Sequence, residues 1–195
     1  NVFILSDDIY EHLTYDNFKF FTIAQIKDLK DRTLTMNGVS KSYAMTGWRI
    51  GYGAATKEII KAMAKLQSQS TTNPSSISQA AAVEALNGNQ DFMLKRNQTF
   101  KERRDFVVET LNKIEGISCL KPNGAFYVFP NCLRFLNKKD KTGKIIKNDS
   151  DFVNSLLENY QVAVVQGSAF GLEGYFRISY ATSMDNLTKA LDRIS

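Results

Sequence analysis

The pattern of apolar and polar residues predicts a chain that changes character near its middle. In the first part, residues 2–6 form an unbroken apolar run of the kind buried in parallel sheets. Residues 32–37 alternate and end at an Asn-Gly turn, and residues 49–54 predict a third short strand. Apolar residues at helical spacing follow, interrupted by Asn-Pro-Ser at 73–75. The helices expected here cover residues 57–68, 76–86 and 90–114.

The second part alternates short strands with two amphipathic helices. The long helix before it is charged around most of its surface and carries only an apolar stripe, which is typical of a helix that spans between domains. We therefore expect an α/β fold in three pieces: residues 1–88 from a large domain, an interdomain helix over 89–115, and a smaller α+β domain over 116–195. The strands expected in the last piece are 117–120, 125–129, 162–165 and 176–180, and the helices are 149–160 and 184–194.

Composition limits the class of protein. Of the 195 residues, 43% are hydrophobic and 23% are charged, so a largely disordered chain is excluded. No apolar stretch approaches the roughly 20 residues that a membrane helix needs, and we expect no membrane partner. Two cysteines, Cys119 and Cys132, are too few for a disulfide framework and favour a reducing, cytoplasmic location.

The opening residues are unusual for the start of a domain. They enter an apolar strand directly, with neither an initiator Met nor a polar lead-in. A strand of this type needs neighbours on both sides. We therefore expect the chain to be the C-terminal part of a longer protein.

The net charge of +5 suggests an anionic partner but does not identify one. The lysines are spread along the sequence, and the one local cluster, at 138–147, is interleaved with Asp140 and Gly143. Such a segment is typical of a solvated loop, so we expect no nucleic-acid partner. A small molecule that bears a phosphate fits the motifs below better.

Two polar side chains follow the first strand. Asp7 and Tyr10 lie just beyond its carboxyl end, the edge at which open α/β sheets bind ligands. The alternative is that Asp7 or Asp8 caps a helix that begins near Ile9. These residues alone leave both interpretations open.

A lysine and an arginine follow the next strand. Lys41 lies among small and aromatic residues, where partial desolvation lowers the pKa of an amine and favours Schiff-base chemistry; an exposed lysine would have no such role. Arg49 lies beside glycines that allow a close backbone approach, and its guanidinium can hold a phosphate through two hydrogen bonds. The glycine spacing matches neither a Walker loop nor a dinucleotide fingerprint.

A second arginine lies in the apolar strand Tyr-Phe-Arg-Ile-Ser-Tyr. A buried arginine such as Arg177 must be paired with an anion. That anion is either an internal carboxylate, of which none is evident nearby in the sequence, or the carboxylate of a substrate. His12 is the single histidine, so the sequence offers no material for a metal site or a serine triad.

Residues 38–51, Gly-Val-Ser-Lys-Ser-Tyr-Ala-Met-Thr-Gly-Trp-Arg-Ile-Gly, resemble the pyridoxal-phosphate attachment signature of class I aminotransferases. The resemblance covers essentially the whole chain, diverges in the lysine-rich loop, and is strongest to the bacterial aspartate aminotransferase branch of the family. Where some members carry a phosphate-binding serine, this chain has Gly38. Four further stretches resemble the family in the same order: 6–11, 69–74, 122–127 and 176–183.

The resemblance implies the C-terminal part of a fold type I transferase, with a large, mostly parallel cofactor-binding domain and a small C-terminal domain. It implies that Lys41 carries pyridoxal 5′-phosphate as a Schiff base and moves the proton at the substrate Cα. Asp7 would pair with the pyridine nitrogen and Tyr10 would hydrogen-bond the 3′ oxygen. Arg49 would hold the phosphate, and Arg177 would bind the α-carboxylate of the substrate.

The same resemblance implies transfer of an amino group from aspartate to 2-oxoglutarate by a homodimer with active sites at the subunit interface. An aromatic or prephenate aminotransferase on the same scaffold is one alternative. Another is a non-catalytic C-terminal piece, because the family's N-terminal half supplies the ring stacked on the cofactor and further phosphate contacts. The groups that select the amino acid also lie in that half, so the sequence leaves open the amino-acid preference and whether this chain binds the cofactor.

Overall fold

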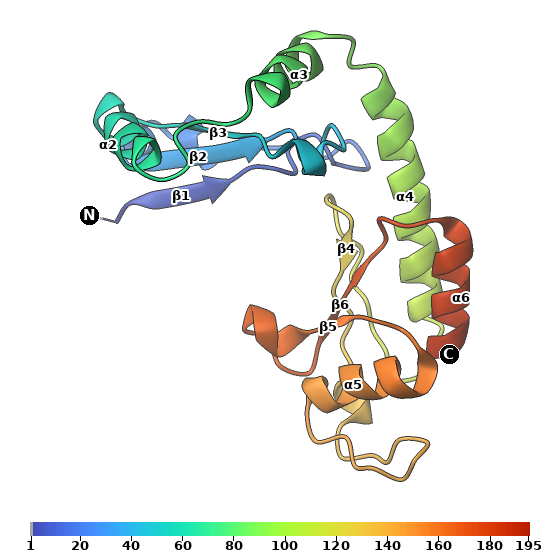
Figure 1. The fold of residues 1–195 in the computed structure, drawn as a ribbon. Helices are drawn as coiled ribbons and strands as arrows, with labels where there is room; N and C mark the ends of the chain where they lie inside the picture. Colours follow the sequence, from blue (N-terminus) through green and yellow to red (C-terminus); the bar gives the residue numbers. More distant parts are fainter. Residues whose placement is uncertain (1) are drawn as a thin grey trace. The chain divides into compact units, whose positions relative to one another are not determined.

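The computed structural model describes residues 2–195 (Figure 1). The chain forms two compact units, Asn1–Lys95 and Arg96–Ser195. The helix α4 (Phe92–Leu111) begins in the first unit, continues into the second, and lies within the range expected for the interdomain helix, 89–115.

The first unit contains a three-stranded sheet in the order β1-β2-β3. Strand β1 (Ile4–Asp7) runs parallel to β2 (Thr33–Gly38), with Asp7 opposite Met36, whereas β3 (Gly51–Ala54) runs antiparallel to β2. The sheet of this unit is therefore mixed and not mostly parallel. Residues 39–50, which connect β2 to β3, form turns and one short 3-10 helix instead of a crossover helix, and the chain reverses direction there.

Strand β1 is at the edge of this sheet and is not buried as its apolar sequence predicts. Phe3 is 77% exposed and Leu5 is 63% exposed, because β1 pairs on one side only within residues 2–195. An apolar hollow of about 400 Å³ lies beside it, lined by Phe3, Leu5, Leu34 and Ile59 among others. Within residues 2–195, the apolar run thus forms an edge strand that pairs with β2 alone.

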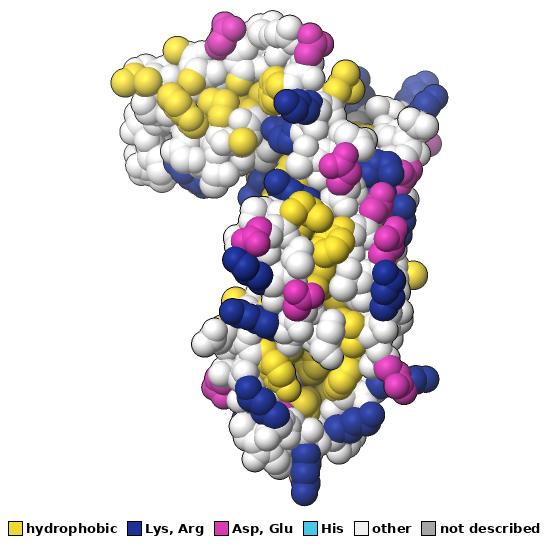
Figure 2. Space-filling model, turned by 90° about the vertical axis from the view of Figure 1, so that its right-hand side faces the viewer, with side chains coloured by type: hydrophobic (Ala, Val, Ile, Leu, Met, Phe, Trp, Pro, Cys, Tyr) yellow, Lys and Arg dark blue, Asp and Glu magenta, His cyan; other side chains and the backbone are white. Residues whose placement is uncertain are grey.

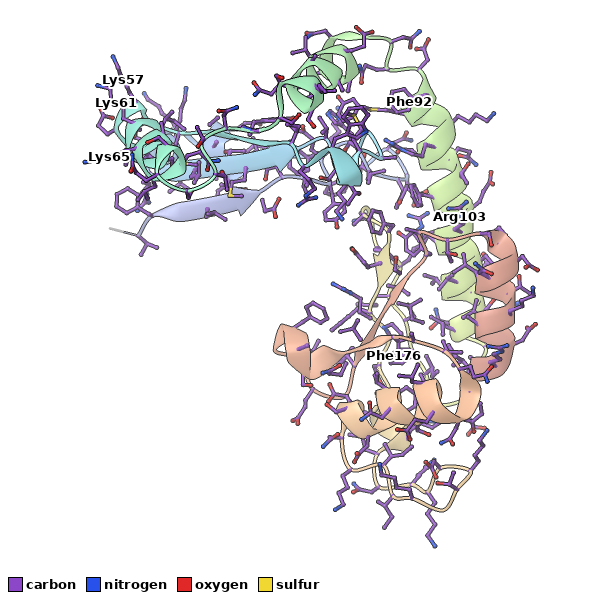
Figure 3. The ribbon with its side chains drawn as sticks, viewed as in Figure 1. Lys57, Lys61, Lys65, Phe92, Arg103 and Phe176 are labelled. Atoms are coloured by element: carbon purple, nitrogen blue, oxygen red, sulfur yellow. The ribbon has the colours of Figure 1, made fainter. Side chains whose placement is uncertain are left out.

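Helix α2 (Lys57–Ser68) covers one face of the sheet, and its bounds are those expected from the sequence. The end of the Met63 side chain lies over Gly53 of β3, where glycine leaves room for it. Three exposed lysines at four-residue spacing lie on the outer side of the helix: Lys57, Lys61 and Lys65 (Figure 3).

The other helices of the first unit are short or lie at its end. Helix α3 (Ser76–Asn87) follows the Asn-Pro-Ser break and ends one residue later than expected, and only Ala82 of its residues is buried. The remaining elements are η1 (Ile23–Gln25), α1 (Lys27–Lys30) and η2 (Thr46–Trp48).

The second unit contains an antiparallel sheet in the order β4-β6-β5, with strands β4 (Tyr127–Val128), β6 (Phe176–Ser179) and β5 (Val165–Gln166). Helices α5 (Asp149–Tyr160) and α6 (Met184–Ile194) have the predicted bounds. Side chains at their starts explain this agreement: Asn148 accepts a hydrogen bond from Asp151 N, and Ser183 accepts one from Asn186 N. Phe176, which is fully buried, lies at the centre of this unit (Figure 3), and the short helices η3 (Leu133–Phe135) and η4 (Gly167–Phe170) complete it.

The strand expected at 117–120 does not form. The side chain of Asn112 binds both backbone groups of Cys119, accepting from its N at 2.8 Å and donating to its O at 3.0 Å. These groups are then not available to a sheet ladder, and only Ser118 forms a single bridge, to Asn131. The strand expected at 162–165 is also shorter, because only Val165 of that range pairs.

A buried arginine fixes the loop that follows α4. The Arg104 side chain is fully buried and its Nη1 donates to Pro122 O at 2.9 Å. Its neighbour Asp105 accepts from Arg104 Nε at 2.9 Å and also pairs with Lys101 at 3.0 Å and with Lys121 at 2.9 Å. Although partial burial acts to raise it, these hydrogen bonds hold the pKa of Asp105 at about 2.

Replacement of Asp105 by Asn is expected to lower the free energy of unfolding by about 2–3 kcal/mol at pH 7, because Arg104 loses its charged partner. A carboxyl with a depressed native pKa stabilises the fold above its unfolded-state pKa, and this stability is lost as the pH falls toward the native value of about 2. Urea unfolding between pH 7 and pH 2.5 should therefore show a steeper acid-induced loss in the parent chain than in Asp105→Asn. An equal acid dependence in both would contradict this role for Asp105.

Both cysteines, Cys119 and Cys132, are buried and free. Burial raises the pKa of Cys119 to about 11 and that of Cys132 to about 12, the latter with a further contribution from the negative charge of Asp149. A thiol reacts as its thiolate. We expect neither cysteine to react with a disulfide reagent at pH 8 in the native protein. Both should react in about 6 M guanidinium, which unfolds most domains. Rapid reaction of either thiol in the native protein would contradict this burial.

None of the helices over residues 2–195 combines the length and the apolar character needed to cross a bilayer. On the face shown in Figure 2, Lys and Arg side chains lie among Asp and Glu. The lysine-rich loop is itself organised around a carboxylate, since Asp140 accepts from Thr142 N at 2.8 Å and from Lys144 N at 3.0 Å.

Candidate active site

The parallel pairing of β1 and β2 brings two of the predicted site segments to one edge of the first sheet (Figure 1). Asp7 is the last residue of β1, and Lys41 follows the end of β2 by three residues. Because parallel strands end at the same edge, the Asp7–Tyr10 turn and the Lys41 loop leave the sheet side by side.

The turn after β1 is not a capped helix. The Asp7 carboxylate is exposed and accepts a hydrogen bond from Ile9 N at 3.3 Å, and residues 9–12 form turns. The adjacent Asp8 is buried, accepts from Ser6 Oγ at 2.7 Å, and donates its backbone N to Met36 O at 2.8 Å. The helix-cap interpretation is therefore wrong, and the two carboxylates differ: Asp8 is engaged by the fold, whereas Asp7 faces outward.

The loop that carries Lys41 is tightly built. Lys41 is half-buried between the buried residues Val39 and Ser42, and Ala44 N donates to Lys41 O at 3.2 Å. Gly38 has no room for a side chain, because an added Cβ would lie 2.8 Å from Ile50 O. A serine at this position would not fit, which gives a packing reason for the glycine found here.

Two residues of this segment have left-handed backbone conformations that non-glycine residues seldom adopt. Ala44 has φ 54° and Arg49 has φ 55°. Such residues cost about 1–3 kcal/mol each and are concentrated at ligand sites. Tyr43, between Lys41 and Ala44, packs its ring 6.2 Å from that of Phe92, which is labelled in Figure 3.

Arg49 lies outside the strand in which the sequence placed it. It ends the helix η2, β3 begins only at Gly51, and the exposed guanidinium donates from Nη1 to Thr46 O at 2.8 Å. The left-handed conformation of Arg49 separates the helix from the strand. Its side chain is anchored at one nitrogen and is otherwise exposed to solvent.

A polar link between the two site segments is not evident in the sequence. Asn37 Nδ2 donates to Glu11 Oε1 at 2.7 Å, while Asn37 Oδ1 accepts from Gly38 N at 2.7 Å. Glu11 Oε1 is also 3.2 Å from His12 Nε2. Burial, followed by the charge of Glu11 and the proximity of Tyr43, raises the pKa of Tyr52. Asn37 thus joins the turn that carries Tyr10 to the strand that leads to Lys41.

The donor set at this edge fits pyridoxal phosphate. A carboxylate, a phenol, an amine and a guanidinium complement a pyridinium nitrogen, a phenolic oxygen, an aldehyde and a phosphate, respectively. Next to Lys41, the Ser42 hydroxyl is buried without a hydrogen-bond partner among residues 2–195. Within the same residues no group of three His, Cys, Asp or Glu side chains could hold a metal ion.

Arg177 belongs to the second unit, in β6. It is half-buried, and no carboxylate of the described chain, residues 2–195, pairs with it. Its guanidinium carbon lies 4.4 Å from the ring centre of Tyr127 and 4.4 Å from that of Phe170. Of the two interpretations of this arginine, the internal salt bridge is therefore not supported.

The fold and the site residues described above indicate a class of protein, and comparison with known proteins indicates the same class. The chain belongs to the aminotransferase class I and II family, whose model matches residues 1–194. Members of this family use pyridoxal phosphate.

Among individual relatives, the chain is 58% identical over 195 residues to the probable aspartate/prephenate aminotransferase of Rickettsia typhi, covering all of this chain and 49% of that protein. It is 59% identical over 196 residues to the aspartate aminotransferase of Rhizobium meliloti strain 1021, covering all of this chain and 48% of that protein. The chain thus spans about half the length of the curated relatives it matches.

Solved structures give the same result. The crystal structure of the aspartate aminotransferase from Rhizobium meliloti matches with a TM-score of 0.95 at 59% identity, over 98% of this chain and 48% of that one. The aromatic aminotransferase from Pyrococcus horikoshii matches with a TM-score of 0.87 at 38% identity, over 99% of this chain and 50% of that one. The α/β fold of this chain is therefore that of part of an aminotransferase.

Proposed function

We propose that this chain is the lysine-bearing part of a pyridoxal-phosphate-dependent aminotransferase that transfers the amino group of aspartate to 2-oxoglutarate. The observation that carries the proposal is the exit of Asp7 and Lys41 from one edge of a parallel strand pair, in a chain of this family. In the whole protein, the open edge of β1 would join further strands of a mostly parallel sheet. Residues 1–88, 89–115 and 116–195 would then belong to the large domain, the interdomain helix and the small domain.

Each site residue has a separate role in this proposal. Bound pyridoxal phosphate supplies a conjugated ring that accepts the electron pair left at the substrate Cα. Lys41 Nζ attaches the cofactor and, once released, takes the proton from Cα and returns it. Asp7 keeps the pyridine nitrogen protonated, and Tyr10 donates to the 3′ oxygen. Arg49 holds the phosphate with the N–H groups that it does not use on Thr46 O.

Arg177 binds the α-carboxylate of the substrate in this proposal. Its support is the guanidinium in β6 for which residues 2–195 provide no carboxylate. A bidentate carboxylate would orient the Cα–H bond for cleavage. A homodimer in the cytoplasm completes the proposal, and the two free, buried thiols support a reducing compartment.

The names of the relatives favour a second candidate acceptor. Several are described as aspartate/prephenate aminotransferases and one solved structure as an aromatic aminotransferase. Rates of amino transfer from aspartate to 2-oxoglutarate and to prephenate, and from phenylalanine to 2-oxoglutarate, distinguish these activities. The highest kcat/KM identifies the preferred pair.

The proposal is tested by adding pyridoxal phosphate, reducing with borohydride, and mapping the adduct by peptide mass. We expect one stable adduct, on Lys41. The exposed lysines of α2, Lys57, Lys61 and Lys65, report the level of non-specific labelling (Figure 3). Labelling of Lys41 no greater than theirs would favour the alternative of a non-catalytic piece, which the half-length of the chain motivates.

A further inference from the structure

Two aromatic rings from different segments converge on Arg177. Tyr127 lies opposite Ser179 in the β4–β6 pair, which places it diagonally to Arg177 on the same face of the sheet. Phe170 ends η4, directly after β5, the strand on the other side of β6. The Arg177 guanidinium thus contacts one ring from β4 and one from η4, and its carbon lies 4.4 Å from both ring centres.

The rings are themselves held in place. Phe129 stacks on Tyr175 with centres 5.6 Å apart and meets Phe170 edge-on at 6.0 Å. The turn that carries Phe170 begins at a glycine packed closely against neighbouring backbone, because a Cβ on Gly167 would lie 2.3 Å from Leu172 O and 2.7 Å from Tyr175 O. On the other side, the Phe126 ring is 4.7 Å from that of Tyr127. The position of each ring is therefore set by the fold of this unit.

This arrangement restricts how Arg177 can bind a ligand. Rings that cover a guanidinium leave its N–H edge as the accessible part, and that edge matches a carboxylate in its own plane. The rings also displace water from the cation, which strengthens its attraction for an anion. Within residues 2–195 no carboxylate occupies the edge.

We propose that Tyr127 and Phe170 are positioning residues that hold the Arg177 guanidinium with its N–H edge toward the α-carboxylate of the substrate. The identity of the carboxylate rests on the proposed function, whereas the restraint on the arginine does not. Neither ring takes part in the chemical step. Their loss should therefore weaken carboxylate binding and leave the turnover rate of bound substrate nearly unchanged.

The kinetic test compares Phe170→Leu with Phe170→Tyr in the protein loaded with pyridoxal phosphate. We expect Phe170→Leu to raise KM for aspartate about tenfold with kcat within about twofold of the parent, and Phe170→Tyr to restore the parent KM because it keeps the ring. Leu172→Ala is the matched control, since Leu172 is 45% exposed in the same turn and Phe170 is 49% exposed. An unchanged KM in Phe170→Leu, or an equal rise in Leu172→Ala, would overturn the proposal.

A second readout needs neither cofactor nor turnover. Phenylglyoxal modifies accessible guanidinium groups, so the rate at which it modifies Arg177, followed by peptide mapping, reports the cover provided by the rings. We expect this rate to rise several-fold, about threefold or more, in Phe170→Leu and to stay at the parent value in Phe170→Tyr. Equal rates in all three proteins would overturn the proposal.

The two readouts separate this proposal from the proposed function. Absence of turnover in the parent protein with every donor tested would count against the aminotransferase, while a ring-dependent modification rate would still support the restraint on Arg177. If Phe170→Leu does not fold, Tyr127→Leu against Tyr127→Phe makes the same comparison on the other ring. A modification rate that responds to neither ring would overturn the proposal.

Discussion

Replacement of Lys41 by Ala should lower kcat for amino transfer from aspartate to 2-oxoglutarate by at least about 10⁴-fold. In the proposed function the amine both attaches the cofactor and moves the Cα proton, and general acid–base catalysis alone contributes up to about that factor. The structure supports this assignment through the placement of Lys41, half-buried in a loop fixed by Gly38 and Val39 at the edge of the parallel pair. A coupled assay for the oxaloacetate formed measures the loss.

Two control variants separate the chemistry of Lys41 from its charge. Lys41→Arg keeps the positive charge, but a guanidinium remains protonated at every accessible pH, so we expect it to be nearly as inactive as Lys41→Ala. Lys61→Ala removes an exposed lysine from α2 and should keep full activity. Retention of more than about a tenth of the parent kcat in Lys41→Ala would exclude Lys41 as the proton-transfer group.

The sequence predicts the helices of this chain better than its strands, for a physical reason. Helices α2, α5 and α6 have the expected bounds, because a helix satisfies its backbone groups locally and its start is encoded in residues such as Asn148 and Ser183. A strand depends on partners that are distant in sequence. The segment 117–120 has strand composition, yet its backbone groups bind the side chain of Asn112.

The features of the site likewise divide into those that the local sequence predicts and those that depend on contacts between distant segments of the chain. The positions of Asp7 at the end of one strand and Lys41 just beyond the end of another follow from the hydrophobic pattern, and the parallel pairing then brings their segments together. The hydrogen bond between Asn37 and Glu11 joins residues 26 positions apart, and no local pattern predicts it. Likewise, the sequence indicates that Arg177 needs an anion but does not show that the Tyr127 and Phe170 rings cover it.

Replacement of Asp7 by Asn should be the next most damaging change, lowering kcat by about 10²–10³-fold. A carboxylate beside the pyridine nitrogen keeps it protonated, and an amide of the same shape does not supply the negative charge. The structure favours Asp7 over its neighbour for this role, since Asp7 is exposed at the end of β1 and Asp8 is buried and accepts a hydrogen bond from Ser6 Oγ. Asp7→Glu should recover part of the rate, because it restores the charge.

Asp8→Asn provides the matched control, one residue away and of identical chemistry. We expect it to lower the free energy of unfolding by about 1–2 kcal/mol through the weakened hydrogen bond to Ser6, with kcat within about threefold of the parent. Asp7→Asn should show the opposite division, a large loss of kcat with little change in stability, because its carboxylate makes a single long contact within the turn, at 3.3 Å to Ile9 N. Steady-state kinetics and urea unfolding on both variants measure the four values. If Asp8→Asn loses the activity and Asp7→Asn keeps it, the ring-nitrogen role belongs to Asp8, and the edge of the sheet must bind the cofactor in a different orientation.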